Sequence, residues 1–182
     1  EEKMDNKAMY KLSYGLFILT AQQDNKDNGC IVNTVTQVTT EPCRITVAVN
    51  KQNLTHDMIA ATGQFNVSVL SENSKFKTYQ HWGFQSGRTT DKLEAINFER
   101  ASNGIVYIND ETNAFISAKV VSMIDLGTHT LFIADVTDCV VLSDTESATY
   151  SYYQKNIKQV ASPTKKKGFI CTVCGYIYEG DT

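Results

Sequence analysis

The stretch CIVNTVTQVTTEPCRITVAV, residues 30–49, decides the fold class. Its first half, 30–40, is rich in Val and Thr, which favour β-strands, and Pro42 then interrupts the pattern. In 43–49, apolar and polar residues alternate, which places Ile45, Val47 and Val49 on one face. This period of two is typical of a strand with one buried side. The stretch therefore predicts two strands separated by a break at Pro42.

Similar patterns recur along the rest of the chain. We expect further strands at 16–22, 65–70, 105–108, 114–122 and 129–142, with Asn-Gly turn chemistry in 24–29. Thr55 is the expected N-cap of a short helix that ends at Gly63, and a second short helix is expected over 74–82. Residues 84–92 read as a loop, and the Tyr-rich 149–157 as helical or extended. Many short strands with few helices predict a mainly antiparallel β-barrel rather than a Rossmann sheet.

Composition narrows the possible functions. The chain has 182 residues, 42% of them apolar, and a formal net charge of −3. This balance gives no electrostatic reason to expect nucleic acid or an anionic membrane as a partner, and the apolar runs are too short to span a membrane. Five cysteines without a signal peptide predict a reducing, cytoplasmic location. We expect Cys30, Cys43 and Cys139, which lie in strand patterns, to be small buried residues.

Four segments are candidates for a binding site. Polar side chains in 33–40 suit either a solvent-facing strand or a polar ligand lying along it. Residues 50–55, from Asn50 and Lys51 to Thr55, end a strand and begin a helix. The N-terminus of a helix attracts phosphate. The Ser-Gly-Arg turn in 84–92 also suits an anion, and His129 begins the strongest strand. Each of these signals is weak alone.

Together these segments resemble the flavin-reductase-like family, which has an FMN-binding split β-barrel of Greek-key type. The similarity extends from about Tyr10 to Tyr153. It rests on YGLFILTA, NTVTQVT, VAVNKQNLTH, FNVSVLSE, SGRTTDK and THTLFIADV. The sequence is most similar to the subgroup in which such a domain precedes a rubredoxin domain, the high-molecular-weight rubredoxins.

The resemblance implies an NAD(P)H-dependent oxidoreductase with FMN as its cofactor. It implies FMN along 33–39, its phosphate and ribityl chain near the helix start and the Ser-Gly-Arg turn, and His129 beside the flavin and nicotinamide as the catalytic residue. The implied cofactor-binding residues are Asn33, Thr34, Val35, Thr36, Gln37, Val38, Thr39, Asn50, Lys51, Thr55, Ser86, Gly87, Arg88 and Lys92. It also implies a homodimer, with NAD(P)H as donor and a rubredoxin centre or a downstream flavo-diiron-type protein as acceptor.

The end of the sequence carries half of a metal site. Cys171 and Cys174 form a C-x-x-C-G knuckle, which with a second knuckle would hold iron or zinc in a tetrahedral S₄ site. The sequence stops eight residues later, so we expect this chain not to close an iron site alone. Truncation, sharing of one metal between two chains, and a free redox dithiol are the three interpretations. The expected domains are 1–158 for the flavin-reductase-like domain, 159–168 for a linker and 169–182 for a rubredoxin-like fragment.

Three functional hypotheses follow. In the leading one, the FMN domain takes a hydride from NAD(P)H and passes electrons to a rubredoxin centre. The alternative is an electron carrier that binds FMN but does not react with a nicotinamide. The third is a barrel that holds haem or another cofactor, against which the Lys51, Thr55 and Arg88 constellation argues.

Overall fold

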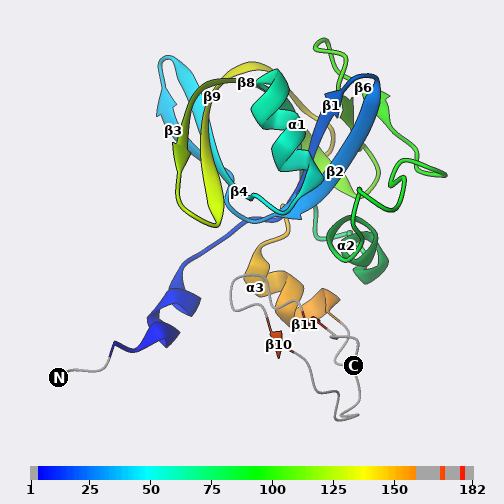
Figure 1. Ribbon diagram of the computed structural model, residues 1–182. Helices are drawn as coiled ribbons and strands as arrows, with labels where there is room; N and C mark the ends of the chain where they lie inside the picture. Colours follow the sequence, from blue (N-terminus) through cyan, green and yellow to red (C-terminus); the bar gives the residue numbers. More distant parts are fainter. Residues whose placement is uncertain (1–3, 159–168, 171–176, 179–182) are drawn as a thin grey trace.

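Seven strands form one antiparallel sheet in the order β2-β1-β5-β8-β9-β4-β3, which curves into the barrel seen in Figure 1. The computed structural model describes residues 4–158 together with 169–170 and 177–178. The strands of the sheet are β1 (Phe17–Gln23), β2 (Lys26–Val32), β3 (Thr36–Thr40), β4 (Cys43–Asn50), β5 (Gln64–Leu70), β8 (Thr112–Asp125) and β9 (His129–Val141). The expected mainly antiparallel split barrel is thereby confirmed.

The core forms where the alternating patterns predicted it. Ile45, Val47 and Val49 of β4 are all buried, and Val47 lies opposite Phe132 of β9 in the antiparallel register. The same cluster includes Leu19 of β1 and Phe65 of β5. Burial of these side chains is the main source of stability of the barrel, because each removes its apolar surface from water.

The two edge strands of the sheet, β2 and β3, are consecutive in the chain and are joined by residues 33–35. The expected continuous strand over 30–40 is therefore wrong. In 33–35 the chain leaves the ladder, and the Thr34 hydroxyl donates to the Ala48 carbonyl at 2.7 Å and accepts from the Ala48 amide at 3.1 Å. This local pairing ties the connection to β4, while all five residues of β3 are exposed.

The turn between β1 and β2 is also displaced from its expected position. Asp24 and Asn25 take positive φ values of 50° and 62°, as a two-residue hairpin turn requires. Asn28 and Gly29 lie within β2 instead. Gly29 is required by packing, because a Cβ there would stand 2.8 Å from Cζ3 of Trp82.

Helix α1 (Leu54–Thr62) lies between the β4–β9 side and the β1–β2 side of the barrel (Figure 1). Its N-cap is Asn53, so the expectation that Thr55 caps this helix is wrong; Thr55 is buried inside the first turn. Gly63 ends the helix with φ 71°, as expected. The remaining helices are α2 (Phe76–Gly83), α3 (Tyr150–Tyr152), the π-helical turn η2 (Tyr153–Ile157) and the N-terminal 3₁₀ helix η1 (Asn6–Lys11).

Short elements complete the described chain. Strands β6 (Glu99–Arg100) and β7 (Val106–Tyr107) pair with each other, as do β10 (Phe169–Ile170) and β11 (Ile177–Tyr178). The expected linker 159–168 and the two knuckle cysteines, Cys171 and Cys174, lie outside the described residues. No helix within the described ranges is long and apolar enough to cross a membrane.

The cysteines of the barrel differ in exposure. Cys30 is buried, and burial raises the pKa of its thiol. Cys43 and Cys139 are exposed, which corrects the expectation that all three are buried. Cys43 opens β4 at the turn from an edge strand, and Cys139 lies on the outer part of β9, so membership of a strand did not imply burial for either residue.

Candidate functional site

The first turn of α1 has no side-chain cap. The Asn53 side chain makes no capping hydrogen bond, and the Asn50 side chain instead accepts from the backbone amide of Gln52 at 2.9 Å. Uncapped amides at a helix start carry a partial positive charge and can receive the oxygens of an anion. The predicted anion-binding end of this helix is therefore chemically open to a ligand.

The Ser-Gly-Arg turn lies against the same helix start, although more than thirty residues separate the two in sequence. A Cβ on Gly87 would stand 2.0 Å from Asn28 Oδ1. Asn28 is buried, and its Nδ2 donates to the Thr55 hydroxyl at 2.9 Å. Gly87, Asn28 and Thr55 thus form a continuous contact from the turn through β2 to α1. The structure thus brings two predicted site residues, Gly87 and Thr55, together through Asn28, which the sequence indicated only as a turn residue.

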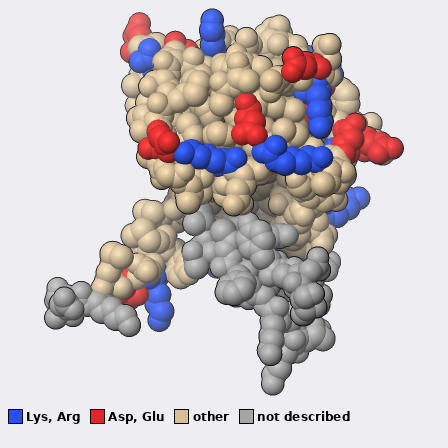
Figure 2. Space-filling model, viewed as in Figure 1, with Lys and Arg blue, Asp and Glu red and all other residues tan. Residues whose placement is uncertain are grey.

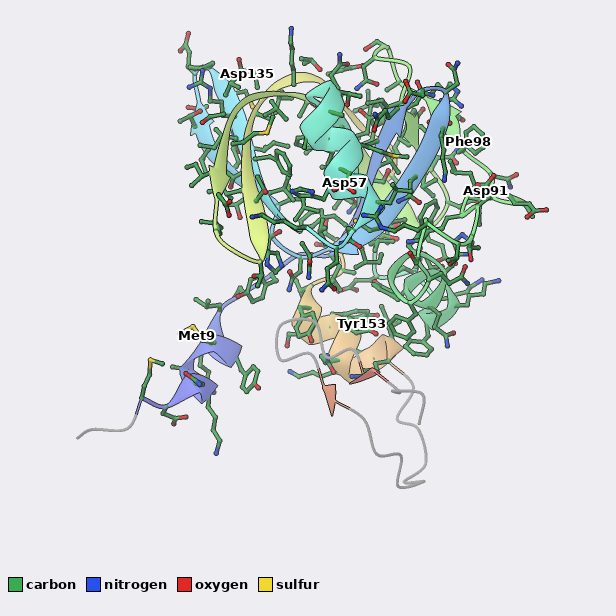
Figure 3. All side chains as sticks on the ribbon, viewed as in Figure 1. Met9, Asp57, Asp91, Phe98, Asp135 and Tyr153 are labelled. Carbon is green, nitrogen blue, oxygen red and sulfur yellow. The ribbon has the colours of Figure 1, made fainter. Side chains whose placement is uncertain are left out.

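Arg88 extends the turn across the outer side of the helix. Its Nη2 donates to Asp57 Oδ2 at 2.7 Å, and Figure 3 labels Asp57 on α1. Hydrogen bonds from His56 and Arg88 hold the pKa of the Asp57 carboxyl below its usual range. This carboxylate stays ionised and therefore holds the Arg88 guanidinium beside the helix start. A phosphate there would meet both the guanidinium and the free backbone amides of the helix.

His56 also belongs to the candidate site, although the sequence did not indicate it. Its Nδ1 lies 3.0 Å from Asp57 Oδ1, and its Nε2 lies 2.8 Å from Thr130 Oγ1. An ionised carboxylate only accepts, so Nδ1 carries the hydrogen, and in the neutral ring Nε2 accepts from the threonine hydroxyl. His56 thereby connects α1 to β9. The only signal in the sequence was its place directly after Thr55.

The predicted catalytic residue, His129, lies at a second part of the site. It begins β9 directly opposite Asn50, the last residue of β4, and its Nδ1 lies 2.8 Å from the Thr128 hydroxyl. Lys51 follows Asn50, but its Nζ pairs with Asp125 Oδ1 at 2.7 Å. His129 and Asn50 are therefore adjacent to the helix start, whereas the Lys51 ammonium points toward the β8–β9 hairpin.

The 33–39 segment is the third part of the candidate site. Residues 36–39 belong to the exposed edge strand β3, which has a neighbour on one side only. Strand edges carry backbone amides and carbonyls that can pair with a ligand. Asn33 adds a buried Nδ2 that has no hydrogen-bond partner among the described residues. It borders a cavity of about 100 Å³ whose other walls include Leu16, Ile31 and Tyr79.

Lys92 does not reach the surface of this site. It is 3% exposed, and its Nζ donates to the carbonyls of Gly29 and Trp82, both at 2.9 Å. Burial lowers the pKa of this ammonium. The structure thus holds the Lys92 ammonium against the backbone of Gly29 and Trp82, in the interior.

The face of the barrel visible in Figure 2 has no dominant charge. Figure 2 shows Lys and Arg side chains interspersed with Asp and Glu along a belt on the visible face, in agreement with the net charge of −3. An anion at the start of α1 would therefore be attracted by the local donors there and not by a basic surface on this face.

Comparison with known proteins identifies the family. The family model described as "Flavin reductase like domain" matches residues 9–161. A high molecular weight rubredoxin from Moorella thermoacetica is 38% identical over 192 aligned positions, covering 97% of this chain and 83% of that protein. A ferric-chelate reductase (NAD(P)H) from Archaeoglobus fulgidus is 38% identical over 150 positions, covering 82% of this chain and 89% of that protein.

A solved structure supports the fold independently. Flavin reductase PheA2 in its native state superposes with a TM-score of 0.68 at 25% identity, covering 80% of this chain and 93% of that one. The expected family, split-barrel fold and flavin class of cofactor are confirmed. Sequence and fold agree, and the chain belongs to the family of flavin reductase like domains.

Proposed function

We propose that this chain holds FMN, oxidises NAD(P)H with it, and passes the electrons to a rubredoxin centre. One observation carries the proposal. The uncapped start of α1, the Gly87 turn and the Arg88 guanidinium meet around Asn28 and Thr55. A phosphate monoester is the ligand that best fits backbone amides, a hydroxyl and a guanidinium gathered at one point.

The residues present fit the two ends of such a cofactor. Thr55, Ser86, Gly87 and Arg88 would hold the phosphate, and Asn50 closes the site toward β9. The exposed edge of β3 and the unpaired Asn33 Nδ2 would meet the carbonyls and ring nitrogens of a flavin. These carbonyl acceptors would satisfy a buried donor that is otherwise costly to leave unpaired.

When bound, a flavin supplies the capacity to take a hydride, which is two electrons at once, and to release electrons singly. The task of the protein is then placement. His129 stands where the start of β9 meets the end of β4, and we assign it the contact with the reacting ring and the nicotinamide. Its Nδ1 is held by the Thr128 hydroxyl, which leaves Nε2 to face a ligand.

The proposal also specifies the electron acceptor, which is a rubredoxin centre. The relative named high molecular weight rubredoxin matches 97% of this chain, including the C-terminal region that contains Cys171 and Cys174. These two thiolates would be half of a four-cysteine iron site in a whole protein of that kind. Cys171 and Cys174 would hold the iron, and the iron would supply a one-electron acceptor for the flavin.

A homodimer is part of the same proposal. The outer half of β8 and the following turn expose Val121, Met123, Ile124 and Leu126. Large apolar side chains that are exposed together at the end of one β-hairpin are typical of a surface that another protein covers. We assign it to a second copy of the chain, and sedimentation of the purified protein as a dimer is the result that supports this assignment.

Flavin titration followed by anaerobic stopped-flow tests the activity. Added FMN should lose its fluorescence on binding, and NADH or NADPH should then bleach the bound flavin within seconds. If FMN does not bind, the proposal is wrong. If FMN binds but neither nicotinamide bleaches it, the chain is the non-enzymatic electron carrier.

A further inference from the structure

Lys92 is a buried ammonium without a counter-charge in the part of the chain that the structure describes. It is 3% exposed, and its Nζ donates to the carbonyls of Gly29 and Trp82. None of the ion pairs formed within residues 4–158 includes it. Carbonyl oxygens satisfy the hydrogen-bonding capacity of an ammonium, but they do not neutralise its charge.

The Lys92 ammonium is connected to the proposed anion site through residues of β2. Gly29, whose carbonyl holds Nζ, directly follows Asn28, the residue that contacts both the Gly87 turn and Thr55. Cys30, the next residue of β2, interacts with Lys92 on one side and with the Thr55 hydroxyl on the other. The ammonium is therefore held by the residue next to Asn28, and Asn28 and Thr55 form the surface on which the proposed phosphate would rest.

We propose that Lys92 is the buried counter-charge of the phosphate group: a positioning residue that attracts the anion through the Asn28–Thr55 layer without touching it. The inference rests on the proposed FMN function and changes the role of Lys92 within it. A charge in the interior is weakly screened by solvent, so it acts on a nearby dianion more strongly than an exposed lysine does.

The chemistry of the neighbours supports this assignment. The titratable group that faces Lys92 is the Cys30 thiol, and burial raises the pKa of that thiol, so it stays neutral. Thr55 and Asn28 are neutral as well. A phosphate resting on Asn28 and Thr55 would therefore bring a negative charge close to the ammonium. The two carbonyl contacts hold Nζ in one place, so that little reorganisation is required when the anion arrives.

The test compares two flavins that differ only in the phosphate. FMN and riboflavin are titrated against the wild-type chain, the Lys92→Met variant and a Lys77→Met control, which removes an exposed lysine from α2. In Lys92→Met, affinity for FMN should fall by at least about tenfold, while affinity for riboflavin changes by less than about twofold. Lys77→Met should leave both affinities unchanged.

Other outcomes decide against the proposal. Equal loss of FMN and riboflavin affinity in Lys92→Met would mean that the lysine only maintains the structure. Unchanged FMN affinity would exclude any role in the site.

A measurement on the wild-type chain covers the case in which the Lys92→Met variant does not fold. The ¹⁵N signal of the Lys92 ammonium should shift when inorganic phosphate is added, and the absence of a shift overturns the inference. Failure of the wild-type chain to bind FMN overturns the proposed function instead, and the phosphate titration then decides the role of Lys92 separately.

Discussion

Gly87 and Asn28 are in direct contact, because a Cβ on Gly87 would stand 2.0 Å from Asn28 Oδ1. Asn28 is buried and donates to Thr55 in the first turn of α1, so its amide has little freedom to move aside. The contact therefore determines how closely the 86–88 turn approaches the helix. A glycine is required here by space and not by backbone conformation.

We expect Gly87→Ala to weaken FMN binding by at least about tenfold. The added methyl group forces the turn or the Asn28 amide away, which costs about 1–3 kcal/mol and separates the donors. Fluorescence titration gives the affinity. Gly104→Ala is the control: it strains a backbone with φ 81° but meets nothing within 4 Å, so it should lower stability and leave FMN affinity intact. If both variants bind FMN like the wild type, the turn is not part of the site.

Arg88→Met should reduce FMN affinity by about ten- to a hundredfold and leave riboflavin affinity unchanged, because the guanidinium would meet only the phosphate. It should also reduce the salt dependence of FMN binding. Arg100→Met is the control, since Arg100 is similarly exposed and also pairs with an aspartate, although it makes two hydrogen bonds to Asp27 where Arg88 makes one to Asp57. Loss of FMN binding in both variants would indicate general destabilisation.

His129→Gln should separate binding from reaction. The residue stands at the start of β9, and we assign it to the reacting ring rather than to the phosphate, so we expect FMN affinity within about threefold of wild type. The rate of flavin bleaching by NADH in anaerobic stopped-flow should fall by about ten- to a hundredfold, as for loss of one well-placed group. An unchanged bleaching rate would remove His129 from the reaction.

The sequence predicted the barrel because most of its strands carry a local signal. Ile45, Val47 and Val49 alternate with polar residues, and Gly63 follows a helix that it ends, so each pattern required only a few neighbouring residues to interpret. The break at 33–35 could not be read in this way. It depends on Thr34 pairing with Ala48 of another strand, and Thr34 looks like any other β-branched residue.

The sequence indicated several site residues individually, but it did not indicate which of them contact one another in the folded chain. The Asn28-Gly29 pair looked like a turn, whereas tertiary contacts with Gly87, Thr55 and Trp82 explain both residues. Thr55 looked like a cap and is instead buried beneath the site. Lysine is ordinarily exposed, so nothing local could indicate that Lys92 points inward. Such facts arise from packing between distant segments.

The buried Lys92 should also make the stability of the flavin-free protein depend on pH. Its folded-state pKa is lowered by burial, so the unfolded chain binds more protons between that value and the ordinary lysine pKa of about 10.4. Stability should therefore rise with pH in this window, by at most about 1.4 kcal/mol per pH unit.

Urea unfolding from pH 7 to 10 measures this contribution. Cys30 has a raised pKa and contributes with the opposite sign as pH rises, so the difference between wild type and Lys92→Met isolates the lysine. The Lys77→Met control should keep the wild-type profile. If Lys92→Met shows the same profile as well, the ammonium is not desolvated as the structure indicates.

Removal of residues 162–182 should leave FMN binding intact, with affinity within about twofold of the whole chain. The seven-stranded sheet, α1, the 86–88 turn and His129 all lie within residues 4–158, so no donor in the proposed site is lost. A Cys171→Ser/Cys174→Ser double variant is the matched control, because it removes the thiolates and keeps the length. Loss of FMN on deletion, but not in the double variant, would show that the tail is structurally part of the barrel.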